Sequence, residues 1–478
     1  MSIKRMGRNL IQWVAGLVAM APFFMCAQDD TNSPSSSRFS DKPAPLLDQK
    51  FFDRPPPLLE WGDKFLGAGN LQQGFNLPTG ANWTPDFWIY GDFRTAVQTF
   101  DAGNDTRVTE WANRLDLFAN LQFSGTERIL LGIRPLDENG LKYSGYLFEP
   151  RSSNGWVNAL NLVPRTCFFE GEFGQIFPAL TESGKYNLDY GFSIGRQPLL
   201  LQDGLLVNDD SIDLFGVTAN ALHCPYVPTA RITALFAWAE MERAHNQEDP
   251  HAMLVGLDSA ADTAWDTLEA TALYVPSNNR GDGFYSGIGT IQRIGRFNTV
   301  FRVANSVALE QADSRVSSGT LLFSEISFDP HGSHDLVYLN AFCGIDQFAA
   351  ADLAPSAGGP LDRLGILNAS VNLGSYGAPL NNFPENAVGA NLGYQIYYGA
   401  VPRTQLVLEI GGRCPTASAT DLQSLPAEGI AARFQKNFGK RFVVVMDIFG
   451  VLRENDNCAL GASSQLSCGG RLEFMTKF

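Results

Sequence analysis

The 478-residue chain is 45% hydrophobic and 18% charged, and its formal net charge is -15. This acidic balance excludes nucleic acid as a partner, because phosphate binding needs a basic patch. The mean hydropathy of -0.08 excludes a helical membrane protein but is compatible with two or three soluble domains or with one large β-barrel.

Residues 1–27 have the three parts of a secretory signal peptide. Lys4, Arg5 and Arg8 form a basic region, residues 10–25 form an apolar region, and cleavage after Ala27 is plausible. No later apolar run is long enough for a transmembrane helix. We therefore expect a periplasmic, secreted or outer-membrane protein.

Amphipathic segments recur from about Asp86 onward, and the clearest are residues 110–124, 387–399 and 404–413. In the first of them, Leu115 and Leu117 share one face, while Arg114 and Asp116 share the other. A period of two residues indicates strands. The segments have the length that a tilted strand needs to cross a bilayer.

The C-terminal segment shows the same pattern and ends on Phe478. Leu472 and Phe474 share one face, and Arg471 and Glu473 the other. A strand with one apolar and one charged face is what a transmembrane barrel needs, and bacterial outer-membrane barrels commonly end on an aromatic residue.

The connections alternate between short turns and long polar loops. The short turns are 124–127, 293–296, 400–403 and 437–440, and the long loops are near 101–109, 137–164, 242–251, 276–282, 345–386, 414–428 and 453–467. This asymmetry predicts an all-β fold, a transmembrane antiparallel β-barrel of about 18 strands with short periplasmic turns and long extracellular loops. The weakest strands are those near 187–201 and 252–260. A β-helix or propeller would need a fixed repeat period, which the sequence lacks.

The predicted domains are a signal peptide (1–27), a proline-rich segment (28–85) and the outer-membrane barrel (86–478). The segment 28–85 is either a periplasmic extension or a partial plug of the lumen. We expect the loop 345–386 to be able to fold inward and constrict the pore.

Polar strand positions are assigned to the lumen, because large barrels enclose an aqueous interior. The predicted pore-lining residues are Arg114, Asp116, Arg128, Arg134, Arg196, Arg302, Glu325, Glu409, Arg413, Arg433, Arg471 and Glu473. Arginine suits bidentate contact with carboxylates and phosphates, so the lumen would pass anions. The alternative is that these arginines and carboxylates pair with one another and stiffen the wall.

One segment resembles the alginate-export family of outer-membrane barrels. The resemblance rests on residues 190–197 (Tyr-Gly-Phe-Ser-Ile-Gly-Arg-Gln), 204–207 and 213–217. In that family an Asp-Gly-Val follows on the returning strand, whereas here Leu214 and Phe215 separate Asp213 from Gly216. The resemblance implies an 18-stranded pore for a polyanionic or carbohydrate solute, with Arg196 in its lining.

No catalytic set is recognisable, and the chain is not predicted to be an enzyme. His331 and His334 with flanking carboxylates form a solvated turn more readily than a metal site, and His245 and His251 fall in a polar loop. No cofactor or metal is predicted. Cys458 and Cys468 flank one loop and could form a disulfide in an oxidising compartment.

The sequence therefore predicts a passive porin of the bacterial outer membrane for small or polymeric solutes, anionic or carbohydrate, with outer-membrane lipid around it and no nucleic-acid partner. A periplasmic or envelope partner stays open. Two other functions stay open as well: a barrel scaffold that encloses a protein partner, and an outer-membrane hydrolase. A soluble β-rich secreted protein is the alternative fold.

Overall fold

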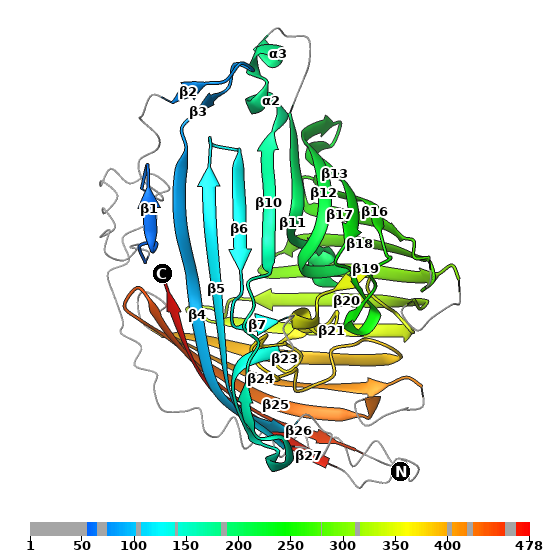
Figure 1. Cartoon of the computed structure of the whole chain (residues 1–478). Helices are drawn as coiled ribbons and strands as arrows, with labels where there is room; N and C mark the ends of the chain where they lie inside the picture. The colour runs from blue at the N-terminus through cyan, green and yellow to red at the C-terminus, as the bar shows by residue number, and fades with distance from the viewer. Residues whose placement is uncertain are drawn as a thin grey trace, which may run out of the picture. The chain divides into compact units, whose positions relative to one another are not determined.

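The computed structural model describes residues 55–64, 74–101, 107–138, 142–182, 189–278, 280–310, 316–398, 404–417, 424–454 and 465–478. All of them belong to one compact unit, residues 53–478. In this described part, the strands pair into a closed antiparallel barrel of 18 strands, which confirms the predicted fold (Figure 1). No helix among the described residues has the length and apolarity needed to cross a bilayer.

The barrel wall is built in chain order, and each strand pairs with the next one in the wall. Its strands are β4 (Asp86–Asp101), β5 (Arg107–Gln122), β6 (Arg128–Ile133), β10 (Pro164–Glu172), β11 (Tyr190–Leu201), β12 (Val207–Cys224), β13 (Val227–Ala239), β16 (Leu254–Asp262), β17 (Asp266–Val275), β18 (Gly283–Ile294), β19 (Phe297–Ala308), β20 (Gly319–Phe328), β21 (Leu336–Asp346), β23 (Ala387–Tyr398), β24 (Thr404–Pro415), β25 (Ala427–Phe438), β26 (Phe442–Arg453) and β27 (Gln465–Lys477). The ring closes where β27 pairs with β4, with Leu472 opposite Val97.

The remaining short strands and helical turns are attached to this wall or lie in its connections. Its short strands are β1 (Leu59–Trp61), β2 (Phe75–Asn76), β3 (Asn82–Trp83), β7 (Asp137–Glu138), β8 (Lys142–Glu149), β9 (Gly155–Val157), β14 (Glu242–Arg243), β15 (Gln247–Glu248) and β22 (Asp352–Leu353). The helical turns are α2 (Phe173–Ile176), α3 (Pro178–Glu182), η2 (Arg151–Ser153), η3 (Gln202–Gly204), η4 (Ala244–Asn246), η5 (Pro355–Ala357) and η6 (Asp362–Leu364). The β8–β9 hairpin extends the sheet beside β5, whose residues 109–113 pair with β8.

Side chains alternate between two faces of the wall, as the two-residue period requires. On β19, Phe301 and Val303 are 40% and 43% exposed on the outer face, while Arg302 between them is only 5% exposed. On β27, Leu472 and Phe474 are exposed and Glu473 is buried, which confirms the predicted faces of the C-terminal strand. An apolar outer face and a charged inner face are the pattern of a barrel that stands in lipid.

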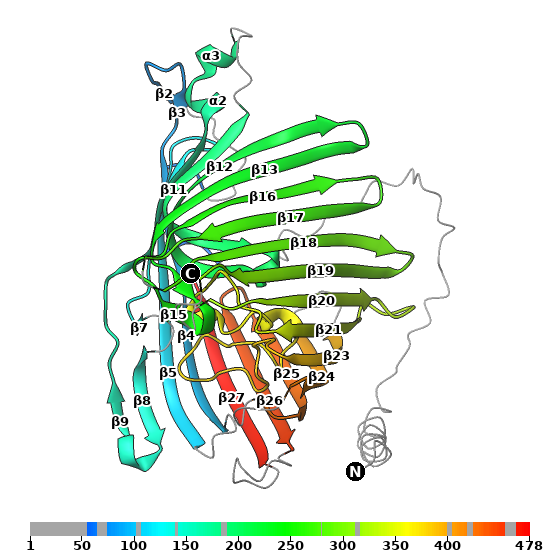
Figure 2. The ribbon, with the colours of Figure 1, turned by 90° about the vertical axis from the view of Figure 1, so that its right-hand side faces the viewer.

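The turns confirm the predicted asymmetry of the connections. The turns at 124–127, 293–296 and 437–440 link β5 to β6, β18 to β19 and β25 to β26 at one end of the barrel. The turn 400–403 lies outside the described residues. The two weakest predicted strands are present as β11 and β16. One connection at this end is unlike the others, because α2 and α3 lie between β10 and β11 (Figure 2).

The two chain ends of the described unit meet at β4. Phe478 exchanges backbone hydrogen bonds of 2.7 and 3.0 Å with Gly91, so the terminal residue completes the closing pair. Beyond that point β1 pairs with β4, with Leu59 opposite Ile89. Trp61 on β1 is 61% exposed. Strand β1 of the segment 28–85 thus extends the sheet at β4.

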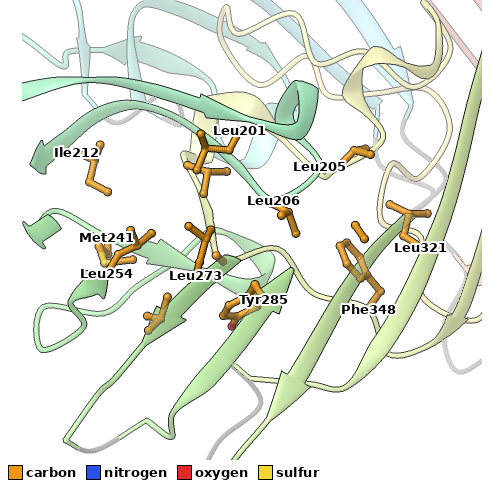
Figure 3. Packing of buried hydrophobic residues seen from close by; sticks show 14 of the residues in the cluster. Leu201, Leu205, Leu206, Ile212, Met241, Leu254, Leu273, Tyr285, Leu321 and Phe348 are labelled. Carbon is orange, nitrogen blue, oxygen red and sulfur yellow. The ribbon is translucent and has the colours of Figure 1, made fainter. Parts of the chain in front are cut away.

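Residues 347–386, which connect β21 to β23, turn into the barrel and are called the inserted loop below. Phe348, Leu361, Leu373 and Leu380 are each at most 1% exposed, which confirms the expectation that this loop folds inward. Its first half (347–364) packs in one apolar cluster with Leu206 and other residues of the β11–β13 and β16–β21 region (Figure 3).

Candidate functional site

Most predicted pore-lining residues lie on the inner face of the wall, alternating with exposed apolar residues. These residues are Arg114 and Asp116 on β5, Arg128 on β6, Arg302 on β19, Glu325 on β20, Glu409 and Arg413 on β24, Arg433 on β25, and Arg471 and Glu473 on β27. Arg134 directly follows β6 and is 6% exposed. Their role in lining a pore stays a prediction.

Arg196 lies elsewhere. It shares its strand face with Ile194 and Leu200, whose side chains are 46% and 45% exposed, so the structure places Arg196 on the outer face. There it binds the Asp213 carboxylate at 2.9 and 3.0 Å and contacts Glu240 at the end of β13. The lumen assignment is corrected, because residue parity along the strand decides the face and the arginine finds its partners at the rim.

Many of the inner arginines are paired with carboxylates. Asp447 on β26 lies between Arg433 at 2.7 Å and Arg471 at 2.5 Å. Arg471 also reaches Glu473, which in turn binds Arg94 of β4 at 2.6 Å. Arg471 is buried, whereas the Arg433 side chain is 26% exposed. Pairing of this kind was the alternative to an open arginine ladder, and it occurs throughout this group of charges.

Two further groups of charges lie around the inner face. Asp116 accepts from Arg114 at 2.7 Å and from Arg134 at 2.9 Å, and Arg134 continues to Asp210 at 2.8 Å. On the opposite arc Arg302 binds Glu269 at 2.9 Å. Two inner charges remain. Arg128 binds Glu170 at 2.5 Å, and Glu325 lies near Arg302, Asp203 and Arg363.

Wall arginines also bind the backbone of the inserted loop. Arg94 donates to the Val371 carbonyl at 3.2 Å and Arg114 to the Asn372 carbonyl at 3.0 Å. Two more donors act nearby: Arg453 reaches the Pro379 carbonyl at 2.8 Å, and Arg413 reaches those of Asn381 and Phe383 at 2.6 and 3.1 Å. Hydrogen bonds from charged donors are the stronger kind, so these contacts fix the path of the loop.

Two wall carboxylates complement these arginines by accepting from loop N–H groups. Glu409 accepts from Ile366 at 2.9 Å and from Leu367 at 2.7 Å. Glu110 accepts from Ser375 at 2.6 Å. The loop passes Glu110 at Gly374, whose φ is +62° and where a Cβ would lie 2.3 Å from the carboxylate oxygen. Glycine is required at this close approach.

The second half of the inserted loop (365–386) fits closely against the wall. A cavity of only about 10 Å³ remains between loop residues such as Val371 and Tyr376 and wall residues such as Arg433 and Phe449. That is room for about one water molecule.

Within the inserted loop, Arg363 is the most accessible charged group of this site. Its side chain is 48% exposed and contacts Asp203 of η3. Its neighbour Asp362 is half-buried and accepts the Ser370 N–H. Burial raises the pKa of the Asp362 carboxyl to about 6, more than the nearby Arg363 and Arg433 lower it.

Sequence reasoning missed several of these residues. Arg94 and Gln98 alternate with Thr95 and Val97 on β4, so the two-residue period would have placed them in the lumen. Glu110 is the first residue of the predicted strand segment 110–124. Arg363 has no such signal, because the inserted loop follows no strand period.

Three other groups that the sequence singled out can be located in the structure: His245, the turn that contains Asp335, and Cys468. His245 pairs with Glu385 at 2.8 Å and stacks on Phe383, which joins two loops. Asp335, in the predicted solvated turn, accepts from Tyr394 and from the Tyr397 N–H at 2.8 and 3.0 Å. Cys468 is exposed on β27, and Cys458 lies outside the described residues, so the disulfide stays a prediction.

Comparison with known proteins identifies the class of fold. The structure is similar to Pseudomonas aeruginosa OccK2 (OpdF) solved in complex with glucuronate, with a TM-score of 0.52 and 11% identity over 85% of this chain and 98% of that one. It is also similar to a BenF-like porin of Pseudomonas fluorescens Pf-5 (TM-score 0.52, 10% identity, 82% and 98% covered). The outer-membrane protein OpdK of P. aeruginosa gives a TM-score of 0.51 at 11% identity, with 82% and 98% covered.

At these identities the likeness establishes the fold alone, that of bacterial outer-membrane porins. No protein-family model matches the sequence. No curated protein matches it either.

Proposed function

We propose that the protein is a porin of the bacterial outer membrane, a passive channel for small anionic or carbohydrate solutes. The observation that carries this proposal is the distribution of side chains on a closed barrel. The outer face of the wall is apolar, as contact with lipid requires, and the inner face carries arginines and carboxylates. The charges act on solutes that diffuse down their own gradient. No enzymatic step is assigned to the chain.

The inserted loop sets the width of the pore in this proposal. Its second half is fastened to β4, β5, β24 and β26 and fills that side of the lumen. Solute must then pass along the free side of the loop, where Arg363 and Glu325 are reachable. A constriction formed by a loop selects by size as well as by charge.

A partly exposed arginine on the free side of the loop gives the channel its preference for anions. Arg363 exposes 48% of its side chain. Asp203 holds it at one side, which orients the guanidinium and leaves donors for a solute carboxylate. A porin of similar fold has been solved with glucuronate, and this supports an anionic sugar as the first solute to test.

The proposed organisation is a signal peptide at 1–27, an extension at 28–85 and the barrel from residue 86 onward. The extension is assigned to the periplasmic end, because its described strand β1 adds to β4 beside the C-terminus. A finer placement in the alginate-export family rests on the short resemblance around residues 190–217 alone, and Arg196 no longer supports it as a pore residue.

A scaffold that encloses a protein partner is the second candidate. It would need a lumen wide enough for that partner, whereas the inserted loop already packs closely against much of the inner wall. The hydrolase alternative rested on His245 and His251. The contacts of His245 with Glu385 and Phe383 give that residue a role in joining loops.

Planar-bilayer recording of the refolded mature chain tests the channel directly. We expect discrete conductance steps, a reversal potential across a KCl gradient that indicates anion preference, and a current that falls when glucuronate is added. Glucose at the same concentration is the matched neutral control and should reduce the current less.

Two results would contradict the proposal. A folded barrel that inserts without conductance steps would favour the scaffold function. Steps with cation preference, unaffected by glucuronate, would contradict the role of the exposed arginines.

A further inference from the structure

Three buried carboxylates meet where three connections of the barrel converge. Asp209 lies near the start of β12, Glu242 in β14 and Asp352 in β22 of the inserted loop. They are 3%, 7% and 0% exposed, and one oxygen of each lies within 4.8 Å of the others. They are the one group of potential metal ligands of this kind among the described residues.

Backbone pairing holds these three residues in place. β22 pairs in parallel with the start of β12, with Val207 opposite Asp352. Asp352 accepts the Glu242 N–H at 2.8 Å through one carboxylate oxygen, and Asp209 accepts the Ser211 N–H at 2.6 Å. The positions of the carboxylates are thus fixed by main-chain contacts of all three segments.

Each carboxylate has a second oxygen without a hydrogen-bond donor. Asp209 Oδ2, Glu242 Oε2 and Asp352 Oδ2 are fully buried and have no such partner. A buried oxygen without a donor is costly, and three in one place are uncommon unless they bind something. This observation distinguishes the group from an acidic patch on a surface.

The nearest arginines are used by other carboxylates. Arg243, next to Glu242 in the chain, binds Asp249 at 3.5 Å and the Gly281 carbonyl at 2.7 Å. Arg165 binds Asp210 at 3.4 Å. Three buried carboxylates so close together disfavour one another's charge unless a cation lies between them.

We infer that Asp209, Glu242 and Asp352 bind a divalent cation of the Ca²⁺ type, which fastens the inserted loop to the barrel wall. Ca²⁺ binds oxygen ligands at about 2.3–2.6 Å, so two ligands of one ion lie at most about 5.2 Å apart. The spacing of the three oxygens fits this limit. The site lies outside the pore charges of the proposed function and does not depend on them.

Calcium titration of the full chain, folded in detergent and treated with a chelator, tests this inference. We expect Ca²⁺ to bind in calorimetry and to raise the thermal unfolding temperature, and Mg²⁺ to act more weakly because it requires a smaller octahedral site. Asp352→Asn and Glu242→Gln should each weaken Ca²⁺ binding at least about tenfold, since even partners of metal ligands matter by that factor.

The behaviour of the same variants without metal separates a lost ligand from a folding defect. In chelator, Asp352→Asn should unfold at the same temperature as the wild type or higher, because one of three buried like charges is removed. Asp362→Asn, which replaces a half-buried carboxylate of the inserted loop outside the group, is the matched control and should keep the full calcium response.

The inference is overturned if the folded wild type shows no response to Ca²⁺, or if both cluster variants respond as the wild type does. Equal effects of Mg²⁺ and Ca²⁺ on wild type and variants alike would indicate screening of the net charge of -15 and would also overturn it. Conductance is not used in this test, so its outcome is separate from that of the channel proposal.

Discussion

The two halves of the inserted loop are held in the barrel by different forces. The first half, residues 347–364, is fixed mainly by apolar packing. Phe348 lies in a cluster with Leu206 and Leu321 (Figure 3). Leu361 and Leu364 belong to the same cluster. The second half has its own apolar contacts, but its path follows hydrogen bonds between charged wall residues and loop backbone.

This difference separates the contacts that hold the loop in the barrel from the contacts that can change with conditions. Apolar packing does not depend on the protonation of a side chain, and removing it leaves a cavity. Hydrogen bonds to charged groups depend on the protonation and position of each partner. The apolar cluster of the first half therefore acts as the anchor of the loop, whereas the hydrogen bonds between the second half and the wall can respond to conditions.

The largest expected effect is a loss of stability after a substitution in the first half of the inserted loop. Phe348→Ala should reduce the free energy of unfolding by about 3–5 kcal/mol, because a fully buried aromatic side chain leaves a cavity. Urea unfolding in lipid vesicles measures this loss. Phe215→Ala on the outer face of β12, 37% exposed, is the matched control and should cost less. Equal losses would remove the distinction between anchor and wall.

Loss of a polar contact between wall and loop should reduce stability less, and its effect should be confined to the loop. Glu409→Gln removes the charge that accepts the Ile366 and Leu367 N–H groups, and each such bond is worth about 1.5–3 kcal/mol. We expect proteolysis within 365–386 to accelerate while the barrel stays folded. If the loop resists protease as in the wild type, packing alone holds the second half.

The contact of Asp362 in the first half with Ser370 in the second half has a pH dependence of defined sign. The pKa of Asp362 is raised from 3.8 to about 6, so its protonated form favours the docked loop. This stabilisation is complete below the ordinary pKa and is lost as the pH rises through about 6. Protease sensitivity of the loop should rise over that range. In Asp362→Asn the rise should disappear, and a rise that persists would assign the effect to another group.

The smallest expected effect is on selectivity. Arg363→Gln removes an exposed pore charge and should shift the reversal potential toward cations with little change in stability, because exposed ion pairs contribute at most about 1 kcal/mol. Arg296→Gln, at the turn between β18 and β19, is the matched control. A shift of the same size in the control would indicate an effect of overall charge.

The wall of this barrel could be predicted from the sequence because lipid imposes its pattern directly. Each strand must alternate apolar and polar residues, and Leu472 and Glu473 show this without knowledge of their neighbours. Parity identified the inner position of Glu409 in the same way. Arg196 was placed from a resemblance and from its charge, and the strand parity shared with Ile194 decided otherwise.

The contents of the barrel could not be predicted because they depend on pairings between distant residues. Glu242 and Asp352 lie 110 positions apart and meet only when β22 pairs with β12. The backbone contacts of Arg94 and Arg114 with the inserted loop likewise join segments more than 250 positions apart. No local period reports such contacts, so the inward fold of 345–386 was expected only as a possibility.

The central claim is that the second half of the inserted loop sets the width of an anion-preferring pore. Single-channel recording of wild type and Glu409→Gln in the same bilayer tests it most directly. The account predicts discrete steps in both proteins, with larger conductance and weaker block by glucuronate in the variant. Equal conductance, with the loop released as judged by proteolysis, would contradict it.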